Sequence, residues 1–129
     1  MNPDNERKLQ QRIAQVGNSA LARAGYVTAV DVLVGIGWLD PPQVERWRRG
    51  QVPYLERVAG ANLKKLGTAL RIFARWADSC SLRPSETVYV SWTKDRHPLR
   101  FSKSGDPNIE RAYRTHRVSP ALSKRKASN

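Results

Sequence analysis

The spacing of the hydrophobic residues changes once along this chain, near Pro84. Before it, apolar residues recur every three or four positions, which is the period of a helix. After it, residues 88–92 and 99–101 alternate between apolar and polar, as β-strands do. The change predicts an α+β fold that is mainly α, with four to five helices and one C-terminal β-hairpin whose charged turn spans residues 93–98. A winged-helix-like arrangement is one form of such a fold.

Helix start and stop signals divide the sequence into segments. A capping residue followed by proline or by an acidic residue is typical of a helix start, and glycine is typical of a stop. The starts are Asn2-Pro3, Thr28 with Asp31, Asp40-Pro41-Pro42, Asn62 and Asp106-Pro107. Gly25 and Gly50 are stops, whereas residues 17–19 interrupt the first helix and leave open whether it is one helix or two. The last helix is expected to carry His116 on its apolar face.

The length of 129 residues suits one domain. We expect a single compact domain over residues 1–120, with a helical part at 1–82 and a hairpin–helix part at 83–120, followed by a basic flexible tail at 121–129. The longest apolar run, residues 32–39, is far shorter than the roughly 20 residues of a membrane-spanning helix. The sequence therefore predicts a protein without membrane contact.

The N-terminal residues lack the apolar stretch of a secretory signal, and Cys80 is the single cysteine. An internal disulfide and a multi-cysteine zinc site are thus excluded, and a cytoplasmic location is expected. We expect no cofactor and no metal site. Catalysis is disfavoured, because His97 lies in a turn and His116 on an apolar face, which leaves a nuclease as the weakest hypothesis.

Positive charge gathers in the second half of the chain. The net charge is +12; residues 1–60 carry eight Lys or Arg and six Asp or Glu, whereas residues 61–129 carry fifteen and five. Such asymmetry is typical of proteins that bind polyanions, because cations at phosphates release counterions. DNA or RNA is the expected partner. An acidic protein surface, a place in a ribonucleoprotein and a merely solubilising role remain alternatives, and the oligomeric state is left open.

Two sets of cations are candidate nucleic-acid contacts. Lys64, Arg71 and Arg75 share one face of the helix after Asn62. The hairpin adds a second set that could lie along a phosphate backbone, Lys94, Arg96, Arg100 and Lys103. We expect both sets to form one continuous basic surface. Tyr89 and Trp92 lie on opposite faces of one strand, so the outward ring of the two could stack on a base.

Residues 30–47 read as two helices joined by a turn at Gly37, with Val44 and Trp47 fixing the second helix. Together with the following Arg-Arg-Gly-Gln-Val-Pro, this segment resembles the helix-turn-helix of excisionase and MerR-type DNA-binding domains. The resemblance implies a regulatory DNA-binding role, with the second helix in the major groove. The residues that would then face bases or phosphates are Gln43, Arg46 and Arg49. An ordinary corner of the core is the competing interpretation.

Overall fold

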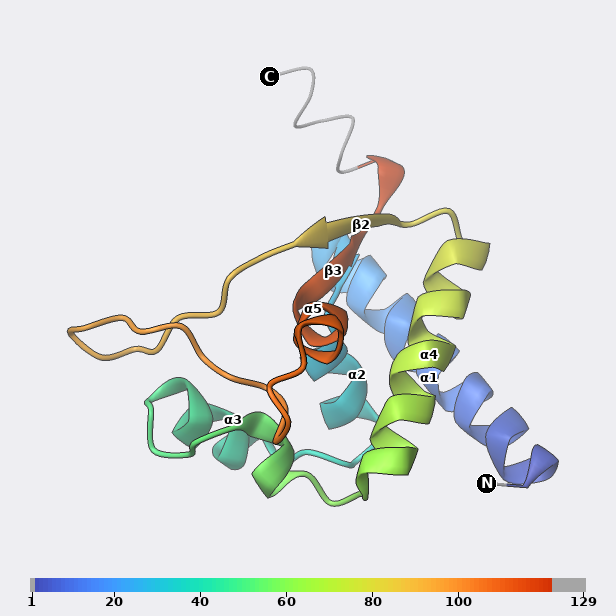
Figure 1. Ribbon diagram of the computed structural model, residues 1–129. Coiled ribbons are helices and arrows are strands. Elements are labelled where there is room, and N and C mark those ends of the chain that lie inside the picture. Colours follow the sequence, from blue (N-terminus) through green and yellow to red (C-terminus); the bar gives the residue numbers. More distant parts are fainter. Residues whose placement is uncertain (1, 122–129) are drawn as a thin grey trace.

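Each α-helix begins at the residue that the capping signals indicate. The computed structural model describes residues 2–121 (Figure 1). The helices are α1 (Pro3–Ala24), α2 (Ala29–Gly35), α3 (Pro41–Arg48), α4 (Leu63–Ser79) and α5 (Pro107–Arg114), with a 3-10 turn, η1, at Leu55–Val58. The side chains of Asn2, Thr28, Asn62 and Asp106 accept capping hydrogen bonds, whereas Asp40 makes none and is followed by Pro41 at the first helical position. Gly25 ends α1 in a left-handed conformation, and α1 is one unbroken helix.

The strands form one small antiparallel sheet. They are β1 (Tyr26–Val27), β2 (Arg83–Glu86) and β3 (Thr115–Val118), in the order β1-β3-β2, so the last strand in sequence is the central one. Val118 pairs with both Tyr26 and Arg83. The α+β, mainly α prediction is confirmed, but these three strands were not among the predicted ones.

The predicted hairpin is confirmed as a chain reversal but is wrong as a pair of strands. The segment 87–105, hereafter the arm, turns back on itself around one isolated bridge between Val90 and Pro98. Pairing stops there because the amide of Trp92 donates to the Arg48 carbonyl and the amide of Arg96 donates within the turn, to Thr93. Neither N–H is then free to extend a ladder.

The last helix is shorter than predicted. It ends at Arg114, and the following residues, His116 among them, belong to β3 instead. Pairing with strands on both sides satisfies their backbone groups, which local helical periodicity cannot reveal. The predicted tail falls on residues 122–129, outside the described residues, except for Ala121.

The core joins the helical layer to the base of the arm. Trp47 of α3 is fully buried, its ring centroid lies 5.0 Å from that of Phe101, and its indole N–H donates to the Arg100 carbonyl at 2.8 Å. Phe101 in turn stacks on Tyr113 of α5 at 5.3 Å. On the other side α1 packs against α4 (Figure 1). Within residues 2–121, no helix combines the length and apolar character needed to cross a membrane.

Candidate nucleic-acid interface

The arm is fixed to the C-terminal end of α3. The Trp92 amide donates to the Arg48 carbonyl at 2.7 Å. The imidazole of His97 lies over Gly50, where an added Cβ would come within 3.3 Å of the ring. Gly50 has a φ of +77°, so a side chain there would be strained as well as crowded. The predicted second helix and the predicted hairpin are therefore neighbours, on the side of the molecule away from α4 (Figure 1).

The side chain of Arg48 lies between two aromatic rings. Its guanidinium carbon is 5.2 Å from the ring centroid of Tyr89 and 5.0 Å from that of Trp92. A cation at this distance is attracted to the ring faces, so Arg48 and the two rings hold one another in place. Trp92 is nevertheless 59% exposed, whereas Tyr89 is half-buried. Trp92 is thus the outward ring of the pair.

Tyr89 belongs to the interior side of this cluster. Burial raises the pKa of its phenol to about 12, so the group is neutral at physiological pH. Its hydroxyl lies 2.8 Å from Nε2 of His116, which also stacks on Tyr26 at 5.5 Å. Burial lowers the pKa of His116, so its ring stays neutral and Nε2 can accept the phenol proton.

A shallow groove runs beside Arg48. Its volume is about 380 Å³, and three of the five large apolar side chains that are exposed in residues 2–121 line it, namely Tyr26, Val88 and Trp92. The described lining residues include no carboxylate, and Arg48 is the charged residue among them. Asp31 lies close by, but its carboxylate accepts the Thr28 amide of the α2 capping box. Clustered exposed apolar residues of this kind mark binding surfaces.

The outer side of α3 carries the residues singled out by the helix-turn-helix resemblance. Arg46 donates to the side-chain oxygen of Gln43 at 3.0 Å, and Arg49 forms an ion pair with Glu45 at 2.6 Å. Gln43 and Arg46 can therefore act together on one ligand, whereas the charge of Arg49 is partly compensated. The resemblance itself stays a prediction, although Gly37 has a φ of +84° in the turn between α2 and α3.

The arm separates its four predicted cations into two pairs. Lys94 and Arg96 are exposed in the turn, on either side of Asp95. Arg100 folds back at the base of the arm, where its Nε donates to the Ser102 carbonyl at 2.8 Å and its guanidinium lies 5.7 Å from the Tyr54 ring. Lys103 has an exposed side chain beside it. We therefore define the α3–arm surface as Gln43, Arg46, Arg48, Arg49, Trp92, Lys94 and Arg96.

The predicted cations of α4 lie elsewhere. Arg71 donates to Thr68, one turn away and next to Lys64 in the same row, and Arg75 continues the row in exposed positions. Figure 1 shows α4 and the tip of the arm on opposite sides of the molecule. The expected single basic surface is therefore divided into two, because folding places α1 and α2 between these segments.

A serine, a histidine and an aspartate meet in the arm without forming a catalytic arrangement. Ser91 Oγ and Asp95 Oδ2 both lie 3.1 Å from the same atom, Nδ1 of His97. A triad needs its nucleophile and its carboxylate on different ring nitrogens. Hydrogen bonds from Thr93 and His97 lower the pKa of Asp95, which is consistent with a cluster that closes the turn.

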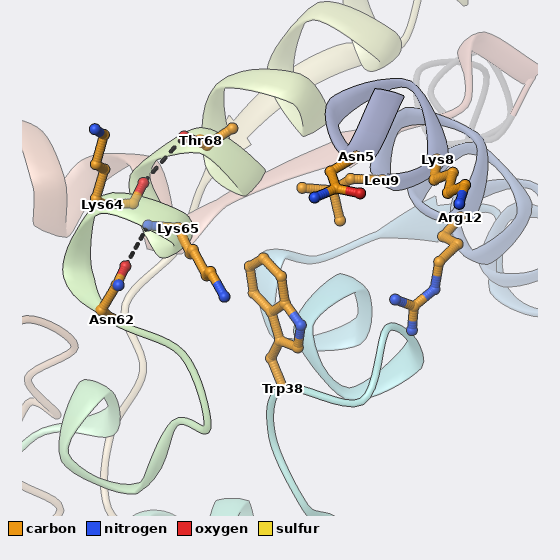
Figure 2. Close-up of a pocket in the computed structure, with 9 residues that line it drawn as sticks. All are labelled: Asn5, Lys8, Leu9, Arg12, Trp38, Asn62, Lys64, Lys65 and Thr68. Carbon is orange, nitrogen blue, oxygen red and sulfur yellow. Dashed lines mark hydrogen bonds between the residues drawn. The ribbon is translucent and has the colours of Figure 1, made fainter. Parts of the chain in front are cut away.

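Lys64 leads to a pocket that the sequence did not suggest. The pocket lies between α1, the turn after α2, and the start of α4, and Lys8, Arg12 and Lys65 line it with Lys64 around Trp38 (Figure 2). The spacing of Lys8 and Arg12 by one helical turn was the available signal, but it pointed to no partner on a distant helix.

No family model, curated protein or solved structure matches this chain. Its function must therefore be inferred from its own residues. The α3–arm surface and the pocket between α1 and α4 offer the clearest chemistry for that purpose.

Proposed function

We propose that this protein binds nucleic acid at the α3–arm surface, with an unpaired base on Trp92 and phosphates on the surrounding cations. The observation that carries the proposal is the position of Arg48, which covers one side of the Trp92 ring while 59% of that residue stays exposed. A solvent-exposed tryptophan beside cations offers a stacking platform together with backbone contacts, and single strands use both.

The two parts of the surface have different roles. Arg46, Lys94 and Arg96 are exposed and form no ion pair with a carboxylate in the described part of the chain, so they are available for phosphates. Such contacts give affinity that falls with salt and does not depend on sequence. Stacking on the tryptophan contributes about 1–3 kcal/mol per base and requires a base that is not paired.

The test measures binding of one unstructured DNA strand, the equivalent RNA and their duplex at several salt concentrations. We expect Trp92→Leu to weaken single-strand binding about tenfold without changing its salt dependence, and Trp92→Phe to retain most of the affinity. Arg46→Gln with Arg96→Gln should reduce the slope of log affinity against log salt by about 1.4, as two lost phosphate contacts require. Arg23→Gln with Arg75→Gln removes the same charge elsewhere and is the matched control.

Two results would contradict the proposal. If the control pair weakens binding as much as the surface pair, only net charge matters. If Trp92→Leu changes affinity for the duplex and the strand equally, no base is stacked, and the helix-turn-helix interpretation of Gln43 and Arg46 becomes the better one. Tight binding to an acidic protein but to no nucleic acid would favour the docking alternative.

A further inference from the structure

A second site lies on the other side of the molecule. It is a pocket of about 460 Å³ between the N-terminal half of α1 and the first turns of α4, within the size range of small-ligand sites. Trp38, in the turn between α2 and α3, stands between the two helices (Figure 2). A half-buried indole at the centre of a polar pocket offers a flat apolar surface to a ligand.

The charge of this pocket has one sign. Lys8 and Arg12 reach it from α1, and Lys64 and Lys65 from α4, and none of its described lining residues is acidic. Within residues 2–121, none of these cations forms an ion pair with a carboxylate. The acidic residues of the first turn of α1, Asp4 and Glu6, do not line the pocket. Cations that converge without a counter-charge repel one another, and a bound anion removes that repulsion.

The polar groups are held in place by the backbone. Arg12 donates from its guanidinium to the carbonyl of Ile36, one end of the turn that carries Trp38. The Trp38 carbonyl accepts the Gly60 amide at 2.7 Å, which fixes the turn to the segment before α4. Asn62 caps α4 by accepting the Lys65 amide at 2.9 Å. The pocket is therefore formed before any ligand arrives, so binding loses little entropy.

The directions of the side chains separate two roles. Figure 2 shows Lys65 and Arg12 approaching the Trp38 ring from opposite sides, whereas Lys64 extends away from it. The Trp38 indole N–H has no hydrogen-bond partner among the described residues. A ligand that lies on the indole therefore has cations at both of its edges, and Lys64 can contribute only to the field at the rim.

We infer that this pocket binds a nucleoside phosphate, with the base on Trp38 and the phosphate between Lys8, Arg12 and Lys65. A phosphate ester carries up to two negative charges and several acceptors, which suits three converging cations better than one carboxylate does. The base supplies the flat surface that the indole can cover. This inference does not rest on the nucleic-acid proposal, because the pocket shares no residue with the α3–arm surface.

The test titrates adenosine monophosphate into the full chain and follows the Trp38 indole N–H by NMR. We expect a saturable shift of that resonance and a rise in melting temperature, because the ligand binds the folded state alone. Adenosine and ribose 5-phosphate should each bind at least about tenfold more weakly than the nucleotide, since each lacks one of the two contacts. Equal binding of adenosine and the nucleotide would overturn the inference.

Variants locate the site. Lys8→Gln with Lys65→Gln should weaken nucleotide binding at least about tenfold, because two charged hydrogen bonds are lost. Arg7→Gln with Lys94→Gln removes the same charge outside the pocket, and an equal loss from this control would show a general charge effect and overturn the site. The Trp38 shift in the unmodified chain decides the matter even if a variant fails to fold, and its absence at saturating nucleotide overturns the inference.

The nucleotide could be free or part of a strand. A single-stranded oligonucleotide that displaces adenosine monophosphate and loses affinity with Lys8→Gln and Lys65→Gln identifies the strand as the source. An oligonucleotide that binds without displacement, and that responds to Trp92→Leu alone, identifies a free nucleotide as the ligand. Both results support the pocket chemistry. Failure at Trp92 leaves this inference intact, so the two proposals fail separately.

Discussion

Gly17 tests how closely α1 and α4 approach. An alanine Cβ at this position would lie 2.2 Å from Cη2 of Trp76 and 2.4 Å from Cζ3. Carbon atoms pack at about 3.5–4.0 Å, so the helix and the ring must separate by more than about 1 Å. The indole is also stacked on Phe73, with ring centroids 6.4 Å apart, so moving it disturbs a second contact.

Gly17→Ala therefore sets two effects against each other. Overpacking of this kind costs about 1–3 kcal/mol. Alanine is better than glycine inside a helix by roughly 1 kcal/mol. The difference predicts a net loss of about 1 kcal/mol in the free energy of unfolding, measured by urea denaturation with an unchanged m-value. Asn18→Ala, at the exposed neighbouring position, has no clash and should stabilise by about 0.5 kcal/mol.

A double variant makes the reasoning refutable. Trp76→Leu removes the ring that Gly17 faces, so Gly17→Ala in that background should become stabilising by up to about 1 kcal/mol. The sign of one substitution would then depend on a residue in another helix. If Gly17→Ala stabilises the unmodified protein, or has the same sign in both backgrounds, the close approach of α1 and α4 is refuted.

Three further predictions concern stability. Burial lowers the pKa of His116 below its unfolded value of about 6.5, so the unfolded chain binds the proton first; stability should be complete above about pH 6.5 and fall with pH below it, and His116→Gln should flatten that urea-midpoint profile. Glu110 accepts the amides of Phe101 and Ser102 at 3.0 and 2.7 Å, so Glu110→Ala should lower the unfolding free energy by about 2–3 kcal/mol, and a loss below that of an exposed alanine substitution would contradict this role. Thr28→Ala should remove about 1 kcal/mol by opening the α2 capping box, read out as a lower melting temperature, while an unchanged value would mean that tertiary contacts alone hold α2.

Local signals were sufficient for the helices. Asn2, Thr28 and Asn62 each cap a helix through their own side chains, and a hydrogen bond across three residues leaves its mark in a short stretch of sequence. The same locality explains the error at Gly17. Its low helix propensity suggested a break, but the deciding contact is with Trp76 of another helix.

The sheet and the sites depend on distant contacts. β1 has two residues, and β2 contains Pro84 and is exposed along its length, so neither shows a strand pattern. The α3 cations and the arm were predicted separately, and the link between them is one backbone hydrogen bond from Trp92 to Arg48. In the pocket, Lys64 was predicted for its helix face, whereas Trp38 was expected in the core and is only half-buried.

The position of β3 has a consequence for synthesis of the chain. This strand lies between β1 and β2 and is made last of the three, so Tyr26 and Arg83 must wait for Val118 before either has its neighbour. A nascent chain that leaves the ribosome N-terminus first can assemble helices early, but it cannot close its sheet until nearly all of these residues have emerged. Ribosome-bound chains stopped shortly before Thr115 should therefore show protected helical amides and an unprotected Val27.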